Sequence, residues 1–193
     1  MVGYAVILLS FPQALAAWPA LGGAESLTTD TLSGATYLSE FRYREAMTVD
    51  EFLINNPQVI HQQIIAALFL LGGLGLIYLK IISWRIPLTL LITVGVLASV
   101  TYDQGSTQSL GSAWFHWTTG GTVAAAFFVA TDPVTHPSRH SHQVIFAISI
   151  GILLFVIRTQ GNLPDGIAFA VLLANCATPL LNRIHRQRAS QRV

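Results

Sequence analysis

A polar stretch near the N-terminus carries a threonine whose hydroxyl is a candidate for covalent attachment of a phosphorylated group. It reads Asp-Thr-Leu-Ser-Gly-Ala-Thr-Tyr-Leu from Asp30 to Leu38. A threonine hydroxyl can form a phosphodiester when an enzyme brings it up to an activated phosphate. Gly34 and Ala35 leave the backbone before Thr36 open to such an enzyme, because neither carries a side chain larger than a methyl group. Thr36 is therefore the first candidate for chemistry.

The residues before Thr36 fit the same chemistry. Ser33 can supply a local hydrogen bond within the loop. Asp30 is placed to contact the attaching enzyme, because its carboxylate would repel the phosphate itself. The alternative interpretation is that Ser-Gly-Ala-Thr forms an ordinary surface turn, and the four small residues by themselves do not exclude it.

Histidines offer a second kind of chemistry. His61 and His116 fall near the ends of apolar segments on one side of the predicted membrane, where an axial pair can hold a haem. A b-type membrane cytochrome is therefore the alternative function, although it leaves the loop around Thr36 without a role. Three more histidines share a polar loop with Arg139, where contact with water or lipid headgroups is a simpler interpretation than a metal site: His136, His140 and His142.

Two carboxylates near the ends of apolar segments need an explanation, since a charge at membrane depth usually has a function. Asp165, between Pro164 and Gly166, is expected to cap the helix that follows it. Asp132, within Thr-Asp-Pro-Val-Thr, either ends a helix or helps to shape a cofactor or ion site. Both interpretations of Asp132 stay open.

The elements that must position these residues are membrane helices. Hydrophobic residues make up 52% of the 193-residue chain and charged residues 10%, with a mean hydropathy of +0.57. An ordinary soluble domain is roughly 25% charged, and a membrane span needs about 20 mostly apolar residues. We predict an all-α membrane protein with six such segments: Val2–Ala20, Val59–Leu79, Ile86–Tyr102, Gly111–Ala130, Gln143–Ile157 and Gly166–Leu181.

Basic residues set the predicted orientation. The last segment is followed by a cluster of arginines that the positive-inside rule places in the cytoplasm: Arg183, Arg186, Arg188 and Arg192. Counting back along the chain leaves Arg42, Arg44 and Arg158 outside. The predicted organisation is a first membrane segment (1–20), an external loop (21–57), a five-helix membrane domain (58–182) and a basic cytoplasmic tail (183–193).

One short helix is predicted inside the external loop, between Tyr43 and Asn56. Thr48 can cap this helix with Glu51 three residues further on, as in a capping box. Three apolar residues on it would then dip into the membrane interface: Phe52, Leu53 and Ile54.

The composition excludes several other classes. A net charge of +1 without a basic soluble face argues against nucleic-acid binding. The single Cys176 excludes an internal disulfide and any cysteine-based zinc or iron–sulfur site made by this chain alone. A passive channel or transporter is a third possibility, but small and polar residues within spans more often allow close helix packing: Thr93, Asn175, Thr178 and the pairs Gly72-Gly73 and Gly120-Gly121.

Four stretches of the chain carry a resemblance to a known family. They are Met1–Pro12, Asp30–Thr36, Phe127–Thr135, and Leu163–Asn175 with Pro179–Leu181. Together they resemble the RnfD family, membrane components of the Rnf ion-translocating electron-transport complex. This family is similar to the NqrB component of the Na⁺-translocating NADH:quinone reductase. The last stretch favours the Rnf family.

The resemblance implies FMN joined covalently to Thr36 by a separate FMN transferase, which takes the flavin phosphate from FAD and releases AMP. The cofactor site is then Thr36 with Asp30, Ser33, Gly34 and Ala35. It further implies a subunit of the bacterial cytoplasmic membrane that relays electrons between redox subunits linked to ferredoxin and NAD⁺, coupled to Na⁺ or H⁺ transport. Residues 21–57 would lie on the periplasmic side, and no residue identifies the ion.

Family members are built from two inverted five-helix repeats, and the last five predicted segments resemble the second repeat. They also carry several membrane helices before the segment that begins here at Met1, so the sequence resembles a C-terminal half. A second flavin, for which Asp132 is a candidate, would be shared with the other half. The residue after Asp30 is often glycine in the family and is Thr31 here, a small change that the transferase is expected to tolerate.

Overall fold

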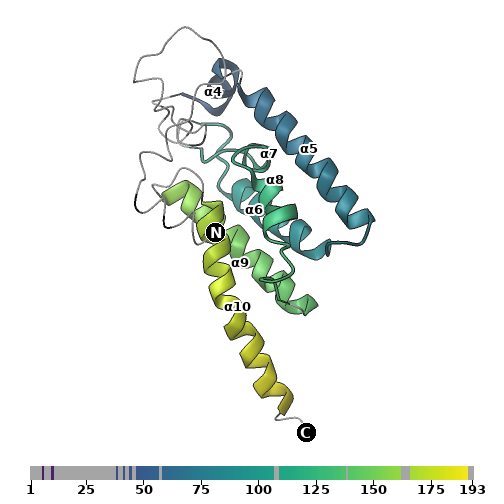
Figure 1. The fold of residues 1–193 in the computed structure, drawn as a ribbon. Helices are drawn as coiled ribbons and strands as arrows, with labels where there is room; N and C mark the ends of the chain where they lie inside the picture. The colour runs from purple at the N-terminus through teal and green to yellow at the C-terminus, as the bar shows by residue number, and fades with distance from the viewer. Residues whose placement is uncertain are drawn as a thin grey trace.

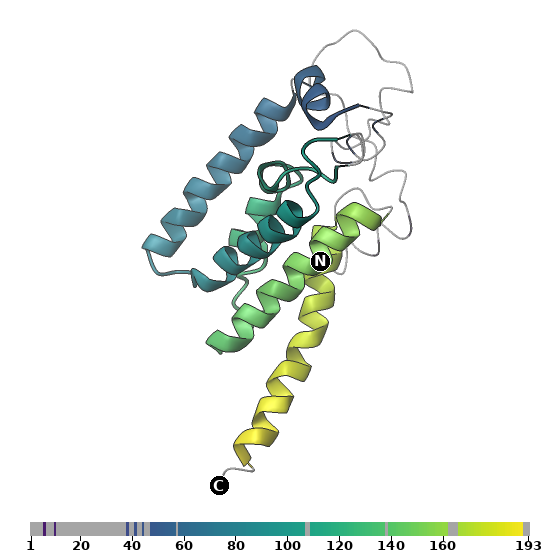
Figure 2. The same cartoon turned by 180° about the vertical axis from the view of Figure 1, so that it is seen from behind.

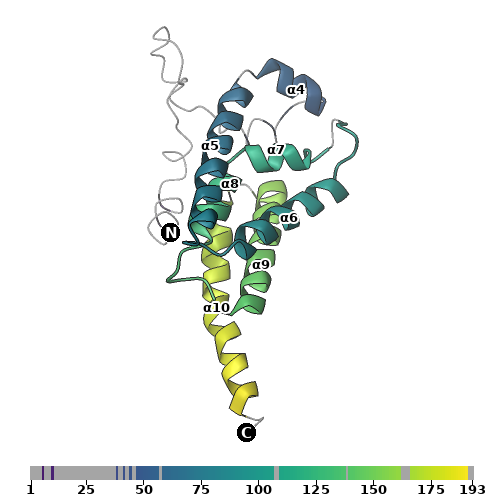
Figure 3. The same ribbon diagram turned by 90° about the vertical axis from the view of Figure 1, so that its right-hand side faces the viewer.

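The computed structural model describes residues 6, 10, 38, 41, 44, 47–56, 58–106, 109–137, 139–161 and 166–190. Within these residues the regular structure is entirely helical, as the sequence predicts. The long helices run alongside one another (Figure 1), while α4 and α7 lie together at one end (Figure 3). The elements are α4 (Val49–Asn55), α5 (Gln58–Tyr78), α6 (Arg85–Val100), α7 (Ala113–Thr118), α8 (Thr122–Ala124), the π-helix η2 (Ala125–Val129), α9 (His140–Gln160) and α10 (Ile167–Ser190).

The helices pack in a fixed order across the molecule. α5 lies on the segment formed by α8 and η2, this segment lies on α6, α6 packs against α9, and α9 packs against α10. Seen from behind, α10 extends past the other helices toward the C-terminus (Figure 2). This helix continues beyond the predicted last membrane segment, Gly166–Leu181, to Ser190, through most of the basic tail. The bounds of the membrane segment itself stay a prediction.

The core forms because apolar residues recur every four positions on facing helices, which keeps them on one helix face. Small residues on α10 let that helix approach α9 closely. The fully buried members on α6 and α9 are at most 1% exposed: Ile86, Leu90 and Val94 on α6, and Phe146, Ile150 and Leu154 on α9.

Two helices of the described chain are long and apolar enough to cross a membrane, namely residues Val59–Tyr78 of α5 and the whole of α9. Only 11% of the most apolar stretch of α5 is buried, against 39% for α9. A helix that is apolar on all sides is either enclosed by protein or lies in lipid. α6 and the apolar part of α10, Ile167–Thr178, are shorter. The number of spans and the five-helix repeat therefore stay predictions.

The prediction of one continuous segment over Gly111–Ala130 is wrong. The chain forms α7, breaks at Thr119–Gly121, and resumes as α8 and η2. Gly120 and Gly121 have φ angles of 63° and 71°, in a region that glycine adopts without penalty. The glycine pair therefore interrupts a helix here, whereas we expected it to serve close helix packing.

The short helix predicted in the external loop is present as α4, and its capping box is confirmed. The amide of Glu51 donates to Thr48 Oγ1, while the amide of Thr48 donates to the Glu51 carboxylate at 3.0 Å. The prediction that Phe52 dips into the membrane interface is wrong, because its side chain is only 3% exposed and packs on Phe41 with ring centroids 5.3 Å apart. Ile54 is 80% exposed.

Candidate functional site

The break between α7 and α8 gathers polar groups inside the helix packing. α7 begins at a cap, where Ser112 Oγ accepts a hydrogen bond from the amide of Phe115 at 3.2 Å. The amide of Thr119 bonds to the carbonyl of Phe115 at 3.0 Å, but the carbonyls after it need donors from outside the helix, since the helix ends at Thr118. Thr122, which is fully buried, supplies one donor, since its hydroxyl bonds to the carbonyl of His116 at 2.5 Å.

Arg158 reaches the break from the last turn of α9. Its guanidinium donates to the carbonyls of His116 at 3.2 Å and Gly120 at 2.9 Å, and to the hydroxyl of Thr122 at 2.7 Å. The side chain is 8% exposed, and a buried cation needs such partners because removing it from water is costly. Arg158 therefore ties the open end of α7 to α9. The side of the membrane on which Arg158 lies stays a prediction.

His116 contributes a buried nitrogen that has no partner. The ring is 3% exposed and lies against Phe155, with centroids 5.3 Å apart. Its Nε2 is 2.9 Å from the carbonyl of Leu110 and so carries the proton as a donor. Nδ1 is then an acceptor, and it makes no hydrogen bond. An unpartnered buried acceptor is costly and calls for a ligand or a water molecule.

The arrangement does not support the haem alternative. His61 is exposed on α5, whereas His116 is buried and has only Nδ1 available. No group of three or more histidine, cysteine or acidic side chains that could hold a metal ion is present in the part of the chain that the structure describes.

Leu38 connects the break to the polar loop that the sequence singles out. A Cβ atom built on Gly120 would overlap Leu38 Cδ1 and would come within 2.8 Å of Arg158 Nη2. Leu38 therefore lies against the break, beside the guanidinium. The predicted site residues themselves lie outside the described residues: Asp30, Ser33, Gly34, Ala35 and Thr36.

A second arginine secures the end of the same loop. Arg44 donates to the carbonyls of Phe41 at 2.9 Å, Met47 at 3.2 Å and Ser109, and its guanidinium carbon lies 3.9 Å from the centroid of the Phe41 ring. Burial lowers the pKa of Arg44 below its ordinary value. The Phe41 ring in turn lies 4.1 Å from that of Phe115 on α7. The loop's C-terminal end is thus attached to the helix that ends at the break.

Comparison with known proteins agrees with the resemblance that the sequence motifs carry. A profile of the NQR2, RnfD, RnfE family matches residues 1–191. The chain belongs to that family.

Relatives within the NQR2, RnfD, RnfE family are named as the D component of the ion-translocating oxidoreductase complex. One from Ectopseudomonas mendocina is 34% identical over 98% of this chain and 60% of its own length. One from Buchnera aphidicola is 36% identical over 94% of this chain and 62% of its own length. One from Stutzerimonas stutzeri is 52% identical, over 63% of this chain and 34% of its own length. The chain thus spans about 60% of the length of the first two relatives.

Asp132 has a structural role in the turn after η2. Its two carboxylate oxygens accept hydrogen bonds from the amide of Val134 and the hydroxyl of Thr135, each at 3.2 Å, as aspartates in turns commonly do. Its carbonyl lies 2.7 Å from Nδ1 of His136. This favours the interpretation that Asp132 ends a helix. Asp165 lies outside the described residues.

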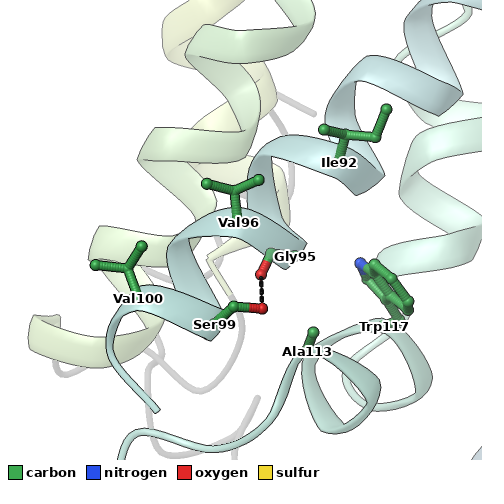
Figure 4. A pocket seen from close by; sticks show the side chains of 7 residues that line it. All are labelled: Ile92, Gly95, Val96, Ser99, Val100, Ala113 and Trp117. Carbon is green, nitrogen blue, oxygen red and sulfur yellow. Dashed lines mark hydrogen bonds between the residues drawn. The ribbon is translucent and has the colours of Figure 1, made fainter.

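A shallow groove between α6 and α7 has a volume of about 440 Å³ (Figure 4). Its lining is mostly apolar, and the hydroxyl of Ser99 is already bonded to the carbonyl of Gly95 at 2.7 Å. Without a charged group, it does not suit a phosphate. The lining residues are Ile92, Gly95, Val96, Ser99, Val100, Ala113 and Trp117.

Sequence reasoning missed the cluster of Arg158, Thr122 and Gly120. One signal was present, because Arg158 is the only charged residue between Gln143 and Gln160 and has no acidic residue near it in that stretch. A lone arginine at the end of an apolar helix suggests main-chain carbonyls as partners. Which carbonyls these are depends on a helix break that hydropathy does not detect.

Proposed function

We propose that this chain is the flavin-bearing part of a subunit of an ion-translocating oxidoreductase complex, with FMN joined to Thr36 through a phosphodiester. The subunit relays electrons between redox subunits of the complex. These are linked to ferredoxin and NAD⁺, and the electron flow is coupled to transport of Na⁺ or H⁺. The subunit lies in the bacterial cytoplasmic membrane, with residues 21–57 on the periplasmic side and the C-terminus in the cytoplasm.

Three observations support this proposal. The relatives are named as subunits of such a complex. The described chain has two helices that can cross a membrane. The position of Leu38, two residues after Thr36 in the sequence, supports a site near the break, because Leu38 lies against Gly120 beside Arg158. The partners that follow are the other subunits of the complex, the surrounding lipid and an FMN transferase.

The residues at the break fit a flavin nucleotide. Nδ1 of His116 is a buried acceptor without a partner, and the isoalloxazine ring offers an N–H donor. Arg158 places a cation in the same region, and FMN carries an anionic phosphate. Positive charge in a water-poor site favours nearby negative charge more strongly than it does in water.

FMN, when bound, accepts and donates the electrons, and the chain's own residues set its surroundings. Arg158 holds the end of α7 in place through the carbonyls of His116 and Gly120. Phe115 and Phe155 both contact the His116 ring, which is buried from water. Arg44 anchors the loop a few residues beyond Leu38, so that the loop end stays against the break.

Flavin attachment can be tested directly. The chain is co-expressed with an FMN transferase of this class and separated on a denaturing gel under ultraviolet light. We expect a fluorescent band for the wild type and none for Thr36→Ala. Thr31→Ala is the matched control, because it removes the same side chain from the same loop and should leave the band fluorescent.

Two results would contradict the proposal. One is a dark wild-type band when the transferase labels a known substrate in the same cells. The other is equal fluorescence of wild type and Thr36→Ala, which would place the flavin on another residue. Intact-protein mass spectrometry decides the second case, because covalent FMN adds a defined mass that Thr36→Ala must lack.

A further inference from the structure

Three cations gather at the end of the helices that lies away from α4 and α7. Lys80 follows α5, Arg85 begins α6, and Arg139 precedes α9. Within the described part of the chain, none of the three has a carboxylate partner. Arg44 and Arg158 at the opposite end differ, since both donate to several main-chain carbonyls. The cations of the first end are therefore available to an anion from outside the protein.

Arg85 is held in a defined place. Its guanidinium carbon lies 5.3 Å from the centroid of the Trp84 ring, and Nη1 lies 3.4 Å from Nδ1 of His140 on α9. An imidazole that accepts at Nδ1 carries its proton on Nε2. Arg85 and His140 therefore present hydrogen-bond donors, supported by the nearby charges of Lys80 and Arg139. Such a donor set matches a phosphate.

The residues around these cations match the boundary of a bilayer. Lys80 stands between two exposed apolar residues, Leu79 at 66% and Ile81 at 64%. Two aromatic side chains at the same end are also exposed, Tyr78 at 86% and Trp84 at 52%. Aromatic residues beside apolar and basic ones are typical of the level of the lipid headgroups. α5 and α9 have 21 residues each, about 30 Å of helix, which matches the hydrocarbon thickness.

We propose that Lys80, Arg85, Arg139 and His140 form a binding site for the headgroup of an anionic phospholipid, which we call the lipid site. Arg85 and His140 donate to the phosphate, Trp84 borders the glycerol region, and Leu79 and Ile81 contact the acyl chains. The occupant is a lipid because the cations are surrounded by exposed apolar side chains at the end of two spans, whereas an acidic protein surface would leave those side chains in water. The lipid site does not depend on flavin at Thr36.

Quenching of tryptophan fluorescence tests the lipid site on the full chain. The purified protein is placed in phosphatidylcholine nanodiscs that contain a minority of brominated phosphatidylglycerol or, in parallel, of brominated phosphatidylcholine. The signal of Trp84 is the difference between wild type and Trp84→Phe. We expect Trp84 to be quenched several-fold more by the anionic lipid. Inorganic phosphate is added as a competitor, to distinguish a site for any phosphate from one that needs the whole lipid.

Two triple variants separate a specific site from overall charge. Lys80→Gln, Arg85→Gln and Arg139→Gln together should abolish the excess quenching. Arg183→Gln, Arg186→Gln and Arg188→Gln together remove the same charge from the tail and should leave it intact. If the first triple variant does not fold, Arg85→Lys is tested in its place. This change keeps the charge but loses the stacking on Trp84, so it should reduce the excess quenching by the anionic lipid.

The proposal of a lipid site is contradicted if wild-type Trp84 is quenched equally by both lipids. It is also wrong if the tail variant loses the excess as fully as the triple variant at the lipid site, because net charge then explains the effect. A site that instead recognises an acidic protein would show no excess quenching in a system of lipid alone.

Discussion

The side chain of Leu38 rests directly on the backbone of Gly120, so closely that a Cβ atom at position 120 would overlap Leu38 Cδ1. Gly120 also has a φ of 63°, which other residues adopt only at a cost. Two independent constraints therefore require glycine at the position where Leu38 meets the helix break.

Gly120→Ala should destabilise the protein and release the loop. We expect a loss of at least about 2 kcal/mol, from the left-handed backbone conformation and the contact with Leu38. Thermal unfolding in detergent measures the loss, and limited proteolysis should show faster cleavage near Leu38. Gly75→Ala is the control, because a Cβ there meets nothing within 4 Å and should stabilise α5 by up to about 1 kcal/mol. Equal effects of the two changes would contradict the contact.

Arg158→Gln should be among the most destabilising single changes. It removes the buried donor to the carbonyls of His116 and Gly120 and to the hydroxyl of Thr122. Hydrogen bonds to a charged group contribute about 1.5–3 kcal/mol each, so a loss above about 3 kcal/mol is expected in thermal or denaturant unfolding. Arg139→Gln removes an exposed arginine and should stay within about 0.5 kcal/mol of wild type. If Arg158→Gln unfolds like Arg139→Gln, the hydrogen bonds of Arg158 do not hold α7 in place.

His116→Gln tests the unpartnered nitrogen. A glutamine can keep a donor near the carbonyl of Leu110, while its amide oxygen replaces the imidazole acceptor at Nδ1 with one of different position and geometry. Protein expressed without the transferase should unfold at about the same temperature as wild type, because one buried acceptor replaces another. Flavinylated protein should show a change in flavin fluorescence, since Nδ1 is the proposed acceptor for the ring. An unchanged flavin spectrum would remove His116 from the proposed site.

Glu51 makes the capping of α4 dependent on pH. The hydrogen bond from the amide of Thr48 lowers the pKa of Glu51 below its ordinary value of 4.5. Because the folded pKa is the lower one, the carboxylate's contribution is fully present above pH 4.5 and is lost as pH falls through the lowered value. Glu51→Gln keeps a cap without this titration. Hydrogen exchange of residues 49–55 in the two proteins should therefore respond differently between about pH 6 and pH 3, and identical responses would show that Glu51 does not titrate in the cap.

Hydropathy and local motifs predicted much of the helical framework. The apolar segments beginning at Val59, Ile86 and Gln143 became α5, α6 and α9, because a long apolar run has few other stable conformations. Thr48 and Glu51 predicted their capping box correctly, because that motif is decided within four residues.

Features that depend on tertiary contacts were not predictable in the same way. The pair Gly120-Gly121 is compatible with close packing or with a helix break, and only Leu38 and Arg158, which are distant in sequence, favour the break. From the sequence we expected Phe52 at the membrane interface, because its contact with Phe41 is a tertiary contact that a local pattern does not show. The flavin attachment at Thr36 stays a prediction from the loop motif and the family, because Thr36 lies outside the described residues.

The segment formed by α8 and η2 lies between α5 and α6 and connects the helix break to α5. Among the described helices, α5 packs on α7, α8 and η2, while its neighbour in sequence, α6, lies on the other side of that segment. The segment formed by α8 and η2 thus has α5 on one side and α6 on the other. α5 follows α4 along the chain and packs on the elements that flank the break. The break is therefore linked to the earlier part of the chain in two ways, by the contact with Leu38 and by the packing of α5.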